Sequence, residues 1–194
     1  MAANPWLVPI TSLRRGAPGA RREEHRVGRL GALAVGASVV PADSDVAVDA
    51  VLEWVGEGVE VAAEVRAPWR GECRRCLTPL EGELRCRVRE LYRRPTGREV
   101  DEETYPLGDD HLDLGPLVRD ALLLELPIAP LCREDCAGLC PTCGVDLNSG
   151  PCGCPPPAGD PRWAALDVLH GGGEEEGGGA GGGAGEGAGR GGSA

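Results

Sequence analysis

Hydrophobic and polar residues alternate along much of the first 92 residues, a pattern that is typical of β-strands with one buried face. In the segment 59–65, VEVAAEV, the valines and one alanine fall on one face and the two glutamates fall on the other. The segment 45–54, DVAVDAVLEW, alternates in a similar way, and GEG at 56–58 suits a turn between the two. These segments therefore predict a β-hairpin.

The clearest strand prediction is for residues 83–92, ELRCRVRELY. One face would carry Leu84, Cys86 and Val88, and the other would carry Arg85, Arg87 and Arg89. We expect one more strand within residues 30–40. Three or four antiparallel strands of this kind predict a small sheet or a partial barrel.

A strong helix signal follows at residues 113–126, within the sequence DLGPLVRDALLLELP. Asp113 can cap the N-terminus, Pro116 suits the first turn, and Pro127 stops the helix. The apolar stripe that would pack on the sheet consists of Leu114, Leu117, Val118, Ala121 and Leu122. The prediction is an α+β fold in which one main helix packs on the antiparallel sheet or partial barrel.

The predicted fold occupies residues 1–170 as a single domain. Its parts are a β-rich part (1–94), an acidic loop (95–112), the main helix (113–126), a cysteine-rich loop (131–155) and a short helix (160–170) that Asp160 would cap and Pro161 would begin. Residues 171–194 are mostly glycine and cannot bury a core, so this tail is predicted to be disordered.

Charge is unevenly distributed along the chain. The 194 residues carry a net charge of -11, and every basic residue is an arginine. Arginine slightly outnumbers the acidic residues in the first half, whereas the second half is strongly acidic. An evenly spread negative charge would argue against nucleic-acid binding, but this distribution leaves a basic region in the first half.

The N-terminal sequence MAANPWLVPITSLRR lacks the apolar run of a secretory signal. The sequence also has no stretch of about 18 apolar residues that could span a membrane. We therefore expect a cytoplasmic protein with reduced thiols, in which clustered cysteines bind metal more often than they form disulfides.

Six of the nine cysteines lie within residues 132–154. The sequence CPTCG at 140–144 is typical of a zinc-binding turn, because a tight C-x2-C turn aims two thiolates at one point. We predict a structural zinc site with the ligands Cys136, Cys140, Cys143 and Cys154, and with Cys132 and Cys152 as alternatives. Six thiols exceed one site, so two are spare, several alternate, or a second metal binds. A thiol-redox device is the alternative interpretation.

Cys73 and Cys76 form a separate C-x2-C pair, which alone is only half of a zinc site. We interpret it as a secondary thiol pair near a hairpin tip, since a catalytic dithiol is expected at a helix N-terminus in a βαβ unit. The three histidines are scattered, and the sequence contains no nucleophile or phosphate-loop motif. These patterns do not favour an enzyme or a small-molecule substrate.

Arginine is concentrated between residues 66 and 94. The candidates for RNA contact are Arg74, Arg75, Arg85, Arg87 and Arg89, the last three of which line one strand face at a spacing of about 6.6 Å. The alternative is a solvated sheet face on which these arginines pair across strands with Glu60 and Glu64.

Four features occur in a fixed order: ECRRCLTPLEG after a strand, the acidic loop, LDLGPLVRDALLLELPIAPLC, and CREDCAGLCPTCGVDLNSGPCGC. This series resembles the YceD-type large ribosomal RNA subunit accumulation proteins, and DPRW at 160–163 and the opening PWLVPITSLRRGAPG are similar to actinobacterial members. The resemblance covers about residues 5–170.

The resemblance implies a non-enzymatic bacterial factor that is needed for accumulation of 23S ribosomal RNA and for large-subunit biogenesis. Its expected partner is a ribosomal RNA precursor or a large-subunit assembly intermediate. Two alternatives remain open at this point. One is a redox-sensitive zinc protein that releases metal on oxidation, and the other is an acidic module that binds a basic ribosomal protein.

Overall fold

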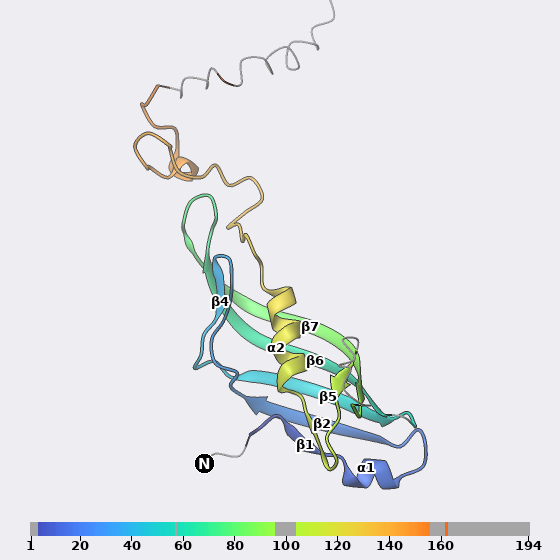
Figure 1. Cartoon of the computed structure of the whole chain (residues 1–194). Coiled ribbons are helices and arrows are strands. Elements are labelled where there is room, and N and C mark those ends of the chain that lie inside the picture. The colour runs from blue at the N-terminus through green and yellow to red at the C-terminus, as the bar shows by residue number, and fades with distance from the viewer. Residues whose placement is uncertain (1–3, 57, 96–103, 156–161, 163–194) are drawn as a thin grey trace, which may run out of the picture. The chain divides into compact units, whose positions relative to one another are not determined.

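The computed structural model describes residues 4–56, 58–95, 104–155 and 162. The chain divides into two compact units, Met1–Gly153 and Cys154–Ala194. The architecture below is that of the first unit (Figure 1). Within the described part of the chain, no helix has the length and apolar character that crossing a membrane would require.

Seven strands of the described residues form one sheet, and two more form a short ribbon. The sheet contains β2 (Arg21–Gly28), β3 (Leu33–Val35), β4 (Ser38–Val40), β5 (Val46–Trp54), β6 (Gly58–Glu72), β7 (Pro79–Arg93) and β8 (Tyr105–Pro106). The ribbon pairs β1 (Leu7–Pro9) with β9 (His111–Asp113). The helices are α1 (Thr11–Arg15), α2 (Gly115–Glu125) and the 3-10 turn η1 (Leu147–Ser149).

Strand β6 is the centre of the sheet. One of its edges pairs first with β5 and then with β4, whereas its other edge pairs with β7 along the whole strand, from Gly58 opposite Arg93 to Glu72 opposite Pro79. All of these pairs are antiparallel, and only the short β7–β8 contact is parallel among the described strands. The β6–β7 hairpin therefore extends past β5 and ends in the turn that carries Cys73 and Cys76 (Figure 1).

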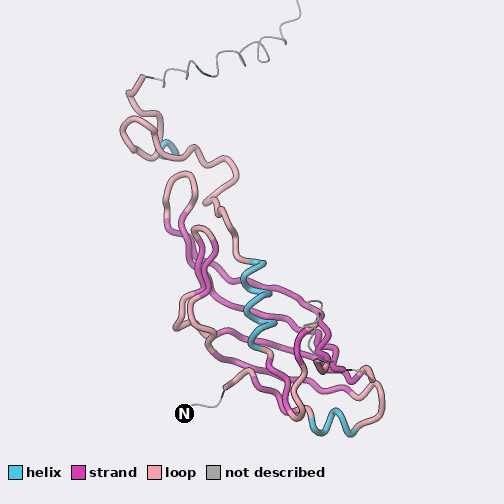
Figure 2. Tube along the Cα trace, in the orientation of Figure 1, coloured by secondary structure: helices cyan, strands magenta, loops and turns pink. Residues whose placement is uncertain are grey.

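Helix α2 lies across one face of this sheet, as the cartoon and the Cα trace both show (Figures 1 and 2). The predicted stripe is buried in full, and Leu114, Val118 and Leu122 are completely inaccessible to solvent. It packs with the inward valines, alanines and leucines of β5 and β6 in a single core. The α+β prediction, an antiparallel sheet with one main helix, is confirmed.

The start of α2 differs in detail from the predicted cap. The helix begins at Gly115 and its N-cap position is Leu114, which has no capping side chain. Asp113 instead accepts a hydrogen bond of 2.8 Å from the Gly115 N–H, so it still satisfies one of the unpaired amides of the first turn. Pro116 lies in that first turn, and the helix ends at Glu125.

Strand β2 was not predicted, because charged residues occupy the positions that face the core side of its partner β5. Glu24 on this side pairs with two arginines of its own strand, Arg22 and Arg26, at 2.8 Å from the second. The charges of these side chains thus pair with one another at the margin of the sheet, where an alternating apolar pattern is not required. The predicted strand at 30–40 is in fact the short β3–β4 hairpin, which turns at Gly36 with φ +56.

The predicted acidic loop, 95–112, contains β8 and most of β9 within residues 104–112. The short helix predicted for 160–170 lies outside the described residues except for Arg162, and the tail 171–194 lies outside them entirely.

Candidate metal centre

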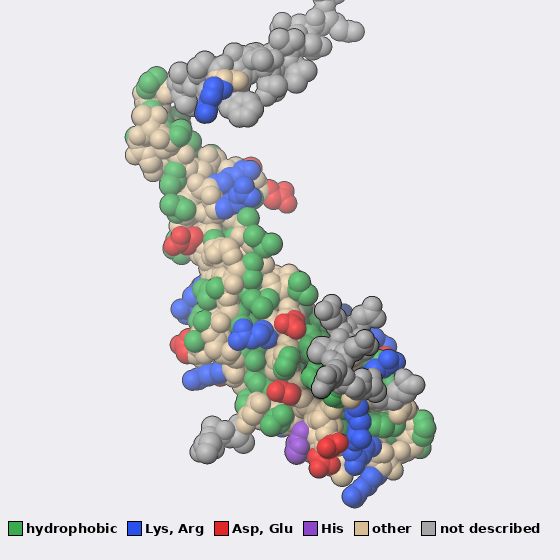
Figure 3. All heavy atoms as spheres, viewed as in Figure 1, with side chains coloured by type: hydrophobic (Ala, Val, Ile, Leu, Met, Phe, Trp, Pro, Cys, Tyr) green, Lys and Arg blue, Asp and Glu red, His purple; other side chains and the backbone are tan. Residues whose placement is uncertain are grey.

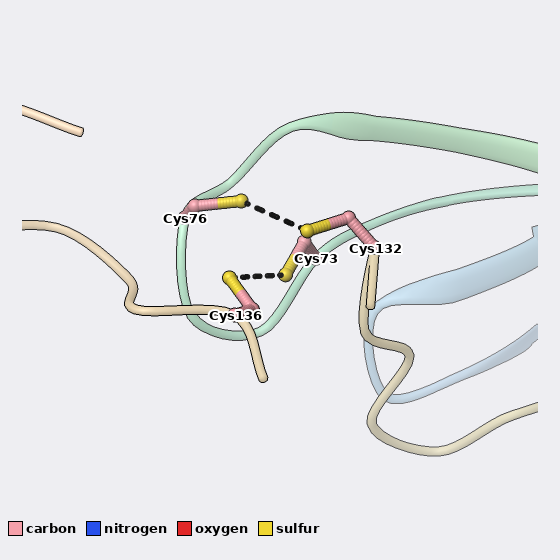
Figure 4. A group of neighbouring side chains, drawn as sticks. All are labelled: Cys73, Cys76, Cys132 and Cys136. Atoms are coloured by element: carbon pink, nitrogen blue, oxygen red, sulfur yellow. Dashed lines mark hydrogen bonds between the residues drawn. The ribbon is translucent and has the colours of Figure 1, made fainter. Parts of the chain in front are cut away.

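Four thiols from two distant segments meet at the tip of the β6–β7 hairpin (Figure 4). We call Cys73, Cys76, Cys132 and Cys136 the hairpin group. All four sulfur atoms lie within 4.8 Å of one another. The Cys73 sulfur is 3.7 Å from that of Cys136, and the Cys76 sulfur is 3.6 Å from that of Cys132. Sulfur atoms at the corners of a zinc tetrahedron with bonds of 2.3 Å would be about 3.8 Å apart, so these spacings fit a metal site with four cysteine ligands.

Hydrogen bonds to backbone carbonyls bring the two segments of the hairpin group together. The Arg74 N–H donates to the Pro130 carbonyl at 2.9 Å, just after α2 has ended. The Arg75 side chain donates to the Cys136 carbonyl at 2.9 Å, and its own carbonyl accepts from the Leu139 N–H at 3.2 Å. These hydrogen bonds hold the hairpin turn against the segment that follows α2. Cys73, Cys76 and Cys136 are buried there in a small cluster of their own.

A second set of thiols lies in the loop that follows. Cys140, Cys143 and Cys152, which we call the distal group, have their sulfur atoms within 4.8 Å of one another. The Cys152 and Cys140 sulfurs are 3.3 Å apart. Cys143 is exposed and Cys152 is half-buried, so this group is more open to solvent than the hairpin group.

The C-x2-C turns of the two groups have the same backbone geometry. In the first turn the Leu77 N–H donates to the Cys73 carbonyl at 2.9 Å, and in the second the Gly144 N–H donates to the Cys140 carbonyl at 2.8 Å. The N–H of the first cysteine in each turn also donates to the carbonyl of the second residue past the turn, Thr78 at 2.9 Å and Val145 at 2.8 Å. Two copies of one turn, each aiming two sulfurs at one or more further thiols, indicate two metal-binding groups.

The two turns also favour ionised thiols, which are the form that binds metal. Burial opposes the ionisation of Cys73, but backbone hydrogen bonds from Cys76, Cys132 and Arg75 outweigh it and lower its pKa to about 6. Backbone hydrogen bonds from Cys143 and Thr142, with the Cys152 thiol, lower the pKa of Cys140 to about 6.

The pKa values of Cys136 and Cys132 in the hairpin group shift in opposite directions. The Asn148 side chain, by hydrogen bonding to Cys136, lowers the pKa of that thiol. Burial and the neighbouring thiols raise the pKa of Cys132 to about 12. A divalent cation would favour the thiolate of Cys132 by offsetting its burial and the neighbouring sulfurs.

The structure separates the ligand set that the sequence suggested. Cys136 lies in the hairpin group, whereas Cys140 and Cys143 lie in the distal group. The two alternatives divide as well, with Cys132 in the first group and Cys152 in the second. Cys154 begins the second compact unit, and only Gly153 separates it from Cys152.

Cys73 and Cys76, which the sequence suggested as a secondary pair, are full members of the hairpin group. The number of cysteines in the sequence could have indicated this. Of the nine cysteines, Cys86 lies within a predicted strand, and the remaining eight make two sets of four. In the structure Cys86 is indeed a core residue, and burial raises the pKa of its thiol.

Three arginines of β7, Arg85, Arg87 and Arg89, lie on the face of the sheet opposite α2, and each of the three contacts a glutamate. Arg87 donates to Glu64 at 3.0 Å and Arg89 to Glu60 at 3.0 Å. Arg85 donates to Glu83 of its own strand at 2.6 Å. This arrangement agrees with the solvated, cross-strand paired face that was the alternative to RNA contact.

The two tip arginines differ from those of β7. Arg74 and Arg75 lie exposed in the turn of the hairpin group, and no carboxylate of the described residues forms an ion pair with either. On the face seen in Figure 3, positive and negative side chains are interspersed among hydrophobic ones.

Comparisons with known proteins place these features in context. A family model described as large ribosomal RNA subunit accumulation protein YceD matches residues 61–170. An uncharacterized protein of Mycobacterium tuberculosis is 41% identical over 175 residues, which cover 87% of this chain and 83% of the relative. A protein of Mycobacterium leprae is 35% identical over 171 residues, covering 86% and 78%.

A shorter match links the chain to plants. The chloroplastic large ribosomal RNA subunit accumulation protein YCED homolog 1 of Zea mays is 37% identical over 57 residues, which cover 29% of this chain and 20% of that protein. No solved structure matches the chain.

Proposed function

Because this chain belongs to the YceD family of large ribosomal RNA subunit accumulation proteins, we propose that it is a non-enzymatic factor needed for accumulation of 23S ribosomal RNA and for biogenesis of the large ribosomal subunit. The observation that carries the proposal is the extent of the family match. Residues 61–170 include most of the β6–β7 hairpin, helix α2 and all nine cysteines.

Depletion of the protein in the bacterium that encodes it tests this function. The ratio of mature 23S to 16S ribosomal RNA should fall, and free large subunits should fall with it, while re-expression of the wild-type chain restores both. An unchanged ratio in fully depleted cells would rule the function out.

The proposed partner is a ribosomal RNA precursor or a large-subunit assembly intermediate in the cytoplasm. Direct RNA contact would use Arg74 and Arg75 at the hairpin tip and Arg85, Arg87 and Arg89 on β7. Exposed ion pairs such as those of the β7 arginines contribute little to stability, so a phosphate group can compete with the glutamates. A basic ribosomal protein is the other candidate partner, through acidic residues 101–103, which lie outside the described residues.

We further propose that both thiol groups bind zinc. A closed set of four thiolates is typical of structural zinc sites, which hold loops that lack a core of their own. The hairpin group supplies four thiols. For the distal group we assign Cys154 as the fourth ligand, because a single intervening glycine keeps its Cα atom within about 7 Å of that of Cys152.

Metal analysis of freshly purified, reduced protein tests the zinc proposal. We expect about two zinc ions per chain for the wild type and about one for the double variant Cys132→Ser with Cys136→Ser. Cys86→Ala is the matched control, since Cys86 belongs to neither group and its replacement should leave both ions in place. Metal-free wild-type protein would contradict the proposal.

The exposure of the distal group favours one alternative role, a redox-sensitive zinc protein. Accessible thiolates are the ones that oxidants reach first. Under this alternative, mild peroxide would release the distal zinc and change the 23S to 16S ratio. Under the main proposal, zinc release would leave that ratio unchanged as long as the hairpin group stays loaded.

A further inference from the structure

The side chain of Asn148 connects the two thiol groups. Asn148 lies on η1, in the loop between Cys143 and Cys152 of the distal group. Its Nδ2 nevertheless donates a hydrogen bond of 3.4 Å to the sulfur of Cys136, which belongs to the hairpin group. One residue of the distal loop thus contacts a thiol of the other group.

The Asn148 side chain forms hydrogen bonds through both its carbonyl oxygen and its amide nitrogen. The Oδ1 atom accepts hydrogen bonds of 2.8 Å from the Ala137 N–H and from the Arg133 guanidinium. The Nδ2 atom donates to Asp146 at 2.7 Å as well as to Cys136. A neutral amide offers two acceptor and two donor sites, and all four are used. A carboxylate of the same shape would place an oxygen against the Asp146 carboxylate and the Cys136 sulfur.

The position of Asn148 depends on the distal loop. No residue of η1 is buried, so packing does not hold this turn in place. Its backbone is held by the Leu147 N–H, which donates to the Gly138 carbonyl at 2.9 Å, and by the Asp146 side chain, which accepts from the Asn148 N–H at 2.9 Å. A further constraint is the closure of the loop by Cys140, Cys143 and Cys152, which flank η1 on both sides.

We propose that Asn148 is a positioning residue through which the distal metal site strengthens the hairpin metal site. A metal bound to the distal thiols fixes the loop, the loop presents the Asn148 amide, and the amide N–H donates to the Cys136 thiolate. This bond offsets part of the negative charge that four thiolates place around a divalent cation, and it orients one ligand. The inference rests on the proposed zinc sites, and it implies that the two ions bind with positive coupling.

Pulsed alkylation of the zinc-loaded, full-length protein can follow the two groups separately. Increasing concentrations of a chelator are added, free thiols are alkylated briefly, and mass spectrometry reports the protection of Cys73 and Cys76 apart from that of Cys140 and Cys143. Removal of a partner that orients a metal ligand typically costs 10–100-fold in affinity. Asn148→Ala and Asn148→Asp should therefore expose Cys73 and Cys76 at a chelator concentration at least about tenfold lower than in the wild type.

The matched controls are Ser149→Ala and Ser149→Asp. Ser149 lies on the same turn, is exposed, and has no side-chain hydrogen bond among the described residues. Ser149→Asp adds the same negative charge as Asn148→Asp, and Ser149→Ala likewise removes a polar side chain, and neither touches either group. We expect both to protect Cys73 and Cys76 as the wild type does.

A double-mutant cycle separates coupling from a merely structural role. Replacing Cys140 and Cys143 with serine should weaken the hairpin site in the wild-type background, because Asn148 is then no longer presented. The same replacement should have no further effect on Cys73 and Cys76 when Asn148 is already alanine. Additive effects in this cycle, or Asn148 variants that behave like those of Ser149, would overturn the proposal.

The possible outcomes also separate the coupling from the proposed zinc sites and from the proposed ribosomal role. Wild-type protein that binds no zinc removes both the zinc sites and the coupling. Wild-type protein that binds two ions with independent chelator midpoints keeps the sites and removes only the coupling. The 23S to 16S ratio in depleted cells tests the ribosomal role without reference to either result.

Discussion

At the scale of single residues, the position just after the second cysteine of each C-x2-C turn has an unusual backbone. Gly144 has φ +73 and Leu77 has φ +59, so both occupy the left-handed region. Glycine adopts this conformation without a steric penalty, whereas a residue with a Cβ does so at a cost of about 1–2 kcal/mol. The distal turn therefore has the residue that suits its geometry, and the hairpin turn does not.

Replacing Leu77 should be tolerated, whereas replacing Gly144 should weaken the distal group. Leu77→Gly removes the strain but increases the entropy of the unfolded chain, so we expect stability to stay within about 1 kcal/mol of the wild type or to rise. Gly144→Leu introduces the strain with no compensating contact, since a Cβ at this position meets no atom within 4 Å. Zinc affinity of the distal group should fall roughly tenfold, measured by competition with a chelator. Equal losses at both positions would contradict this reasoning.

The candidate ligands themselves show what the sequence can and cannot predict at this scale. A C-x2-C turn is a local pattern, so Cys140 and Cys143 could be assigned to a metal site directly. The partners of Cys73 and Cys76 could not, because Cys132 and Cys136 follow 56 and 63 residues later. Only the antiparallel register of β6 and β7 and the path of the chain after α2 bring them together.

At the scale of elements, the β7 strand presents three arginines whose charges are balanced by glutamates. Phosphate contact by this face remains a proposal that can be tested through charge. Replacement of Arg85, Arg87 and Arg89 by glutamine should weaken RNA binding at every sequence and flatten its dependence on salt, because phosphate contacts release counterions. Folding should survive, since Leu84 and Cys86 point to the other side of the sheet.

A control of equal charge is available at three arginines that lie on or next to other elements. Arg15 is on α1, Arg29 follows β2, and Arg119 is on α2. Glutamine at these positions removes the same charge, so the salt dependence should change only for the β7 variant if that face binds RNA. A salt slope for the β7 variant that equals that of the wild type would leave Arg74 and Arg75 as the remaining arginine candidates.

The elements that the sequence predicted are those in which one periodic stripe is buried. Strands β5, β6 and β7 and helix α2 have such stripes, with periods of two and of about 3.6 residues. Strand β2 was missed because its inward residues are charged and pair with one another, as Glu24 does with Arg26. The β1–β9 ribbon was missed because three-residue strands are too short to show a period, and their pairing joins residues about a hundred positions apart.

At the scale of the whole molecule, the two thiol groups and the hydrophobic core occupy separate places. The core joins β5, β6, β7 and α2, whereas Cys73, Cys76 and Cys136 form a small cluster with Leu80 and Leu139. Loss of metal should therefore loosen the cysteine-rich segment without unfolding the sheet.

Limited proteolysis with trypsin tests this separation. After chelation, cleavage at Arg133 should become much faster, because the loop that contains it is no longer closed by metal. The far-UV circular dichroism of the sheet should change little, and its melting temperature should stay within a few degrees, as expected when few core contacts are lost. Restoring zinc should restore resistance at Arg133. Global unfolding on chelation would show instead that the metal sites stabilise the entire fold.

The long sequence separation between the two cysteine pairs of the hairpin group also affects the order in which they are synthesised. A ribosome adds about 5–20 residues per second, so Cys73 and Cys76 leave it several seconds before Cys132 and Cys136 are made. During that interval the hairpin can form, but its turn offers only two of the four thiols. The hairpin group is therefore completed after β7 and α2 have been synthesised, and an ion bound there would fasten a framework that is already assembled. A nascent chain halted before residue 132 would show the sheet taking shape with its tip still open.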